Sequence, residues 1–145
     1  MSDKIQTKID EFKENLLASK EMGQEFMFQV MIDYGKKLGE FPREKMCEPN
    51  QVHGCQSTVY IDAYEKDGLV YYEGFADSRI VAGELYLLLE ALSGNPAKDI
   101  IEDAKEIIDE FVDETGFVAD LTPSRANAFG SMFKMMKRKA EELNN

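Results

Sequence analysis

The middle of the chain carries the pattern that constrains its fold most, a pair of strand-like runs joined by a turn. From Val59 to Ala63, apolar residues alternate with polar and tyrosine residues, as in a strand with one buried face. Asp67-Gly68 is typical of a two-residue hairpin turn, and the run LVYYEGFA after it predicts a second strand. Because an isolated hairpin is only marginally stable in water, we expect a third strand just before Cys55 and helices over one face.

Helical periodicity surrounds this hairpin on both sides. Apolar residues recur every three or four positions in residues 5–16 and 26–38, and again in three regions after the hairpin. One of these, Ile80–Leu92, contains Gly83, where we expect another backbone to approach closely. No linker or repeat divides the sequence. It therefore predicts one α+β domain over residues 1–145, with a small antiparallel sheet of about three strands covered by several helices.

Capping residues predict where the later helices begin. Asp77 or Ser78 is the expected N-cap of the helix that follows the hairpin, and the next helical region is expected to split near residue 102. Thr122 and Pro123 have the order typical of an N-cap and a first helical position. We therefore expect the last helix to begin there.

Charge and hydropathy exclude several classes of partner. The formal net charge of −11 opposes binding to phosphate backbones, so we expect no nucleic-acid partner. No apolar run reaches the roughly 18 residues of a membrane span, and the first residues lack a signal-peptide core, so we expect no membrane partner and a cytoplasmic location. In that compartment Cys47 and Cys55 are expected to be reactive, metal-binding or inert rather than bridged to each other.

Residues 49–58, PNQVHGCQST, place Cys55 in a loop just before the first strand. Gly54 allows a tight bend beside the thiol. A thiol at the rim of a sheet is a nucleophile where nearby charge or hydrogen-bond donors favour the thiolate, and a structural group where it is buried. His53 lies two residues from Cys55, so in an extended segment it is either a proton acceptor for the thiol or a surface hydrogen-bonding group.

The same residues leave two other kinds of site open. Cys55, Cys47, His53 and Asp77 together could hold a metal ion or cluster, although C-x5-H-x-C is not a standard zinc spacing. A cysteine hydrolase or thiol peroxidase would need Cys55, a base and an anion pocket. His53 is a poor base for that chemistry because no orienting partner is evident.

Three runs of sequence carry a family resemblance. In order along the chain, CEPNQVHGCQSTVYI, FADSRIVAGELYLLLEALSG and LTPSRANAFGSMFKMMKRKA resemble the SufE-type sulfur-acceptor proteins of iron–sulfur cluster assembly. The resemblance implies a fold shared with the IscU-like scaffolds. It also implies that Cys55 receives persulfide sulfur from a cysteine desulfurase and passes it to an iron–sulfur scaffold complex. The PLP cofactor would belong to the desulfurase, and this chain, a monomer or weak dimer without a cofactor, would be its partner and activator rather than a stand-alone enzyme.

The resemblance also implies roles for two further residues. Arg125 matches the arginine of the family's LTPSR motif, which lies near the cysteine loop, so we expect it to position the loop or stabilise the thiolate. Asp77 matches an aspartate close to that loop, but helix capping is its expected role on structural grounds. Cys47 departs from the family pattern; of a resolving thiol, a second sulfur site and a buried apolar group, the last is expected. We further expect a resting loop that partly shields Cys55.

Overall fold

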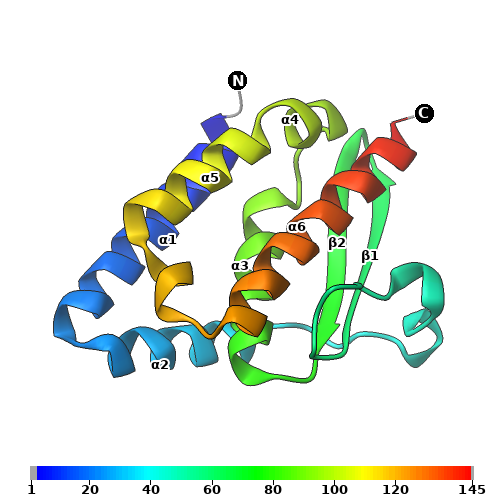
Figure 1. Cartoon of the computed structure of the whole chain (residues 1–145). Helices are drawn as coiled ribbons and strands as arrows, with labels where there is room; N and C mark the ends of the chain where they lie inside the picture. Colours follow the sequence, from blue (N-terminus) through cyan, green and yellow to red (C-terminus); the bar gives the residue numbers. More distant parts are fainter. Residues whose placement is uncertain (1–2, 145) are drawn as a thin grey trace.

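The computed structural model describes residues 3–144 and has helices packed on a hairpin (Figure 1). Short 3-10 helices, labelled η, interrupt two of the connections. In chain order the elements are α1 (Asp3–Met22), α2 (Gln24–Gly35), η1 (Arg43–Lys45), η2 (Glu48–Asn50), β1 (Val59–Lys66), β2 (Leu69–Ala76), α3 (Arg79–Leu92), α4 (Ala97–Glu102), α5 (Ala104–Thr115), η3 (Phe117–Asp120) and α6 (Pro123–Leu143).

The predicted hairpin forms with the expected turn. β1 and β2 pair antiparallel, from Val59 opposite Ala76 to Lys66 opposite Leu69. Both turn residues of Asp67-Gly68 have positive φ, as the turn type that suits this dipeptide requires. The α+β class predicted from the sequence is confirmed.

The expected third strand is reduced to one bridge. Within residues 3–144 the sheet has two strands, and Gln51 makes a single antiparallel bridge to Tyr60 of β1. The backbone N–H of Val52 donates to the Val59 carbonyl over 2.9 Å. Beyond this pair the chain turns away from the sheet edge, because positive φ at Gly54 does not continue a strand.

Helices α3 and α6 cover the hairpin, and α1, α2 and α5 pack behind them (Figure 1). The covered face of β1 presents Val59 and Ile61, which are both fully buried. On β2 the Tyr72 hydroxyl donates to the Met136 carbonyl of α6 over 2.7 Å. Burial raises the pKa of that phenol far above its usual range. The buried hydrogen bond therefore fixes α6 against the sheet at neutral pH.

Two glycines allow α2 and α3 to cross with their backbones in contact. A Cβ on Gly83 would overlap the Met31 carbonyl of α2, and a Cβ on Gly35 would lie 2.9 Å from the Ala82 Cβ. The close approach predicted at Gly83 is thus confirmed. It accounts for a glycine inside a helix, where glycine otherwise costs about 1 kcal/mol relative to alanine.

Substituting Gly83 by alanine should therefore destabilise the protein although alanine is the better helix former. The added methyl must push α2 and α3 apart, and we expect a loss of about 2–3 kcal/mol in the free energy of unfolding. Urea unfolding measures it. Gly130→Ala is the matched control, because Gly130 also lies within a helix and a Cβ there meets nothing within 4 Å. That variant should be as stable as the wild type or more so.

The helix boundaries mostly follow the sequence. The break between α4 and α5 lies at Asp103, beside the predicted position, and α6 begins at Pro123 after Thr122 as expected. Ser78 is the N-cap residue of α3, without a hydrogen bond from its side chain. Of the helices in the described part of the chain, none combines the length and the apolar character needed to span a membrane.

Candidate functional site: the Cys55 loop

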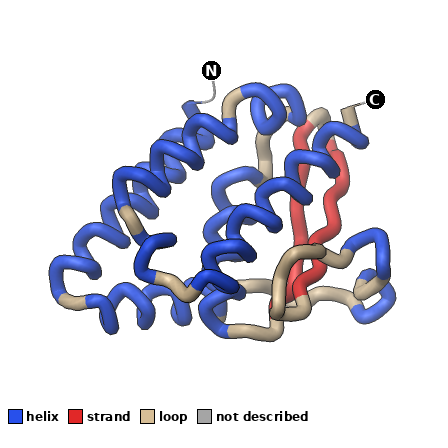
Figure 2. Tube along the Cα trace, in the orientation of Figure 1, coloured by secondary structure: helices blue, strands red, loops and turns tan. Residues whose placement is uncertain are grey.

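Residues 53–58, which we call the Cys55 loop, project from the start of β1. They lie at the end of the molecule where β1, α3 and α6 all begin, and Figure 2 shows them as part of a long connection between α2 and β1. The Val52–Val59 hydrogen bond closes the base of the loop. The hairpin edge thus holds the loop at both of its ends.

Asp77 strengthens this base and does not cap α3. Its carboxylate accepts a hydrogen bond of 3.0 Å from the Thr58 N–H, while its own N–H donates to the Thr58 carbonyl over 3.1 Å. The predicted capping role of Asp77 is therefore wrong, because its side chain turns back to the strand and leaves the N-cap position to Ser78. These two hydrogen bonds attach Asp77 directly to Thr58, the last residue of the Cys55 loop.

Helix α6 holds the other side of the segment. The Asn50 side chain is buried, donates to the Lys45 carbonyl and accepts from Lys139 of α6 over 2.9 Å. Gly54 has φ of 90°, and a Cβ there would lie 2.8 Å from the Ser131 Oγ. A larger residue at position 54 would be strained and would also collide with α6. The loop therefore rests against this helix through a glycine.

The tip of the loop is much less restrained than its base. Among the described residues, no backbone–backbone hydrogen bond involves an N–H or C=O of residues 53–57. Cys55 itself is half-buried and packs against the core, as the predicted shielding of the thiol requires. A segment with firm ends and an unbonded tip can open without unfolding of the domain.

The resting environment disfavours the Cys55 thiolate. Burial raises the pKa of the thiol, and the negative charge of Glu84 would raise it further. In the closed position, Cys55 is therefore a protonated, weakly reactive thiol at neutral pH. Hydration of the sulfur would lower this pKa and increase its reactivity.

Glu84 is the site residue that the sequence analysis missed. It lies on α3, is fully buried, and burial raises its pKa from 4.5 to about 9, with the Arg125 charge opposing that rise. Arg125 is half-buried in the first turn of α6, and its charge acts on Glu84. A carboxyl group within the apolar run of α3 was the available signal, since charged side chains are almost never fully buried without a partner.

His53 and Cys47 are both exposed and have partners other than Cys55. The exposed His53 ring is 3.3 Å from the Glu48 carboxylate, and the bend at Gly54 removes the extended geometry that would align it with Cys55. Cys47 is exposed, with its sulfur 3.6 Å from the Lys45 carbonyl, so its predicted burial is wrong. It immediately precedes the 3-10 turn η2. Both thiols are free among the described residues.

The donor set for the alternative metal site does not converge. Within residues 3–144, no three His, Cys, Asp or Glu side chains lie close enough together to hold a metal ion. Cys47 and His53 face solvent, and the Asp77 carboxylate is taken by the Thr58 N–H. The geometry gives the alternative no support.

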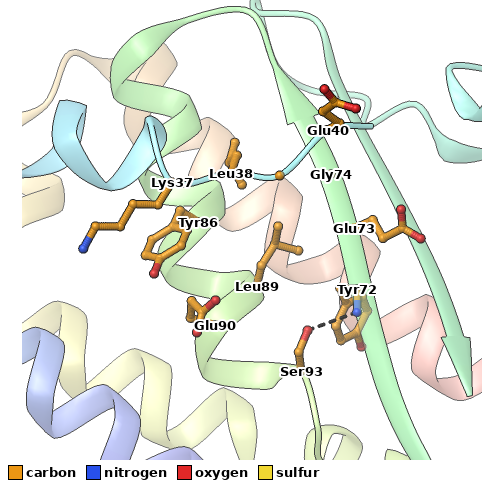
Figure 3. A pocket seen from close by; sticks show the side chains of 11 residues that line it. Lys37, Leu38, Glu40, Tyr72, Glu73, Gly74, Tyr86, Leu89, Glu90 and Ser93 are labelled. Carbon is orange, nitrogen blue, oxygen red and sulfur yellow. Dashed lines mark hydrogen bonds between the residues drawn. The ribbon is translucent and has the colours of Figure 1, made fainter. Parts of the chain in front are cut away.

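A surface pocket formed by residues 37–40, β2 and α3 lies outside this site (Figure 3). Its lining includes Tyr72 and Ser93, which are joined by a hydrogen bond of 3.0 Å from the Tyr72 N–H to the Ser93 hydroxyl. The Lys37 side chain points away from the other lining residues in Figure 3. The residues of the Cys55 loop do not contribute to this lining.

Comparison with known proteins identifies the family. The model of the SufE family, described as an Fe-S metabolism associated domain, matches residues 11–140. The chain belongs to the SufE family. An uncharacterized SufE-like protein of Synechocystis sp. is 41% identical over 113 residues, which cover 78% of this chain and 69% of that protein.

Two more similarities extend the SufE assignment. The cysteine desulfuration protein SufE of Plasmodium falciparum is 32% identical over 114 residues, covering 75% of this chain and 44% of the Plasmodium protein. The solution structure of a hypothetical protein from Thermus thermophilus has a TM-score of 0.70 with 21% identity, covering 94% of this chain and 96% of that one. At this identity, the similarity to the Thermus thermophilus structure supports only the fold of this chain.

Alkylation should reveal the shielding of the thiol in this SufE-family protein. In a Cys47→Ser background, Cys55 should react with iodoacetamide several-fold more slowly at neutral pH than Cys47 does in a Cys55→Ser background. The raised pKa of Cys55 leaves less thiolate at neutral pH, so its alkylation rate should still be rising well into the alkaline range. Equal alkylation rates for the two cysteines at neutral pH would contradict the shielded, protonated thiol.

Proposed function

We propose that this protein is a sulfur acceptor in iron–sulfur cluster assembly. Cys55 takes sulfur from the persulfide of a PLP-dependent cysteine desulfurase and passes it to an assembly scaffold. The family's association with Fe-S metabolism and the similarity to proteins named for cysteine desulfuration support the role. The observation that carries the proposal is a half-buried cysteine on an unbonded loop tip whose ends are firmly held.

The transfer requires a thiolate and no net oxidation or reduction. The Cys55 thiolate attacks the outer sulfur of the donor persulfide, so a new S–S bond forms on Cys55 and the donor's S–S bond breaks. The donor cysteine leaves as a thiolate and takes up a proton, equivalent to the one that Cys55 released. This chain supplies one nucleophile and a docking surface, and the PLP chemistry that generates the persulfide belongs to the desulfurase.

Loop movement reconciles transfer with protection. An exposed persulfide is open to reduction and further oxidation, while a closed one cannot reach its partner. The firm base formed by Val52, Thr58 and Asp77 keeps the loop in register, and the unbonded tip gives Cys55 the freedom to emerge. Docking of the desulfurase then favours the open loop.

We also propose that the exchange occurs in the cytoplasm with the protein as a monomer or weak dimer. The two free thiols fit a reducing compartment. The cysteine, the loop and its supporting helices all come from one chain. The proposed chemistry needs no second copy.

Incubation with a PLP-dependent cysteine desulfurase and free cysteine tests the function. Intact-protein mass spectrometry should then detect the addition of one sulfur atom to the acceptor. Dithiothreitol should remove it, as expected for a persulfide. Omitting cysteine or the desulfurase is the control. An unchanged mass in the complete reaction would contradict the proposal.

A further inference from the structure

Glu84 is a buried carboxyl group to which the proposed reaction assigns no role. Its residue is 0% exposed, and within the described part of the chain neither of its carboxyl oxygens has a hydrogen-bond partner. A buried polar group left without a partner is costly to stability and uncommon in folded proteins. Its retention therefore needs an explanation beyond packing.

The surroundings of Glu84 connect it to the cysteine loop. Among the elements packed against α3, which are α1, α2, β2 and α6, the charged group that acts on Glu84 is Arg125 of α6. From the loop, Cys55 is close enough for the charge of Glu84 to act on its thiol. Glu84 therefore lies within electrostatic reach of both the proposed nucleophile and Arg125.

We infer that Glu84 is a cargo-binding residue whose protonated carboxyl donates a hydrogen bond to the outer sulfur of a Cys55 persulfide when the loop is closed. The inference rests on the proposed sulfur-acceptor function. A persulfide extends the side chain by about 2 Å, the length of an S–S bond, which brings charge-bearing sulfur beyond Sγ. The unpaired carboxyl then gains the partner that it lacks beside the unmodified thiol.

The protonation state of Glu84 suits this task. An ionised carboxylate would repel an anionic persulfide, whereas a carboxylic acid held neutral by an apolar site donates a hydrogen bond at neutral pH. Arg125 adds a positive charge within electrostatic reach of Glu84. The closed loop therefore offers the anionic cargo a proton donor and a cation, while the reduced thiol remains protonated.

Lifetimes of a chemically loaded persulfide test the inference without the desulfurase. In a Cys47→Ser background, Cys55 is converted to a mixed disulfide with thionitrobenzoate and then to a persulfide with sulfide, which displaces the aromatic thiol. Loss of the added sulfur to dithiothreitol is followed by mass spectrometry. We expect the persulfide to survive about tenfold longer with Glu84 than in Glu84→Leu, the effect of one charge-assisted hydrogen bond.

The Glu84→Gln variant gives a readout that a merely structural role would not move. Its amide also donates a hydrogen bond, so the persulfide lifetime at neutral pH should stay near the wild-type value. As pH rises through about 9, Glu84 loses its proton and the wild type should lose its advantage over Glu84→Leu, while Glu84→Gln keeps it. If Glu84→Leu does not fold, the pH dependence of the persulfide lifetime in wild type and in Glu84→Gln still tests the inference.

The outcomes separate the two proposals. Equal lifetimes in wild type, Glu84→Leu and Glu84→Gln, or identical pH profiles in wild type and Glu84→Gln, would overturn the role of Glu84. Glu84-dependent protection of a chemically loaded persulfide would support that role even if a desulfurase failed to load Cys55. Such a failure would instead contradict the proposed function.

Discussion

Replacing Cys55 by serine is expected to abolish the gain of sulfur from a cysteine desulfurase, whereas replacing Cys47 by serine leaves it intact. A serine hydroxyl is not an effective nucleophile without an activating base, and it cannot hold sulfur as a persulfide. The candidate base from the sequence, His53, is exposed and lies 3.3 Å from the Glu48 carboxylate. We expect a rate loss of at least about a hundredfold for Cys55→Ser, measured as the sulfur-bearing fraction of intact protein over time.

Cys47→Ser is a matched control because the two cysteines lie on the same connection between α2 and β1. Cys47 is exposed and its sulfur lies beside the Lys45 carbonyl, so its loss should change neither fold nor reactivity. Similar unfolding curves for both variants would attribute the difference to chemistry. Sulfur loading that survived in Cys55→Ser and vanished in Cys47→Ser would reverse the assignment.

Glu84→Leu is expected to stabilise the folded protein, with a gain that grows as pH rises. The native state raises the pKa of Glu84 from 4.5 to about 9, so it binds one more proton than the unfolded state between these values. The free energy of unfolding is therefore undiminished by Glu84 below pH 4.5. It falls by up to about 1.4 kcal/mol per pH unit as pH rises toward about 9. Leucine removes this loss, and we expect Glu84→Leu to be about 5 kcal/mol more stable near pH 8.

Urea unfolding at several pH values measures this gain. Glu90→Gln is the control, because Glu90 lies on the same helix with an exposed side chain and should change stability by no more than about 0.5 kcal/mol. A leucine variant less stable than the wild type at every pH would show that Glu84 has a stabilising partner. A gain in stability combined with faster loss of the persulfide would be a trade of stability for function.

Local patterns were sufficient to predict most of the fold. The alternation after Thr58 and the Asp67-Gly68 turn determined the hairpin, and the Thr122-Pro123 pair located the start of α6. Gly83 was predicted to meet another backbone because an interior glycine needs a reason, and Met31 supplies it. These features depend on residues near one another in sequence, where steric and hydrogen-bonding preferences act directly.

Features that depend on distant parts of the chain were harder to predict. Asp77 has the chemistry of a cap, and its choice of the Thr58 N–H became apparent only when the hairpin end was placed beside it. Cys47 is apolar enough for a core, but at the start of η2 it is exposed to solvent. Glu84 could have been noticed as a charge within an apolar run, yet its effect on the Cys55 thiol became apparent only from the folded arrangement of α3 and the loop.

Locating the transferred sulfur in the wild-type protein tests the central claim most directly. After a brief reaction with desulfurase and cysteine, free thiols and persulfides are trapped by alkylation, and tandem mass spectrometry of peptides separating the two cysteines identifies the modified residue. The account predicts the extra sulfur on Cys55 with Cys47 alkylated as an ordinary thiol. Extra sulfur on Cys47, with Cys55 unmodified, would contradict it.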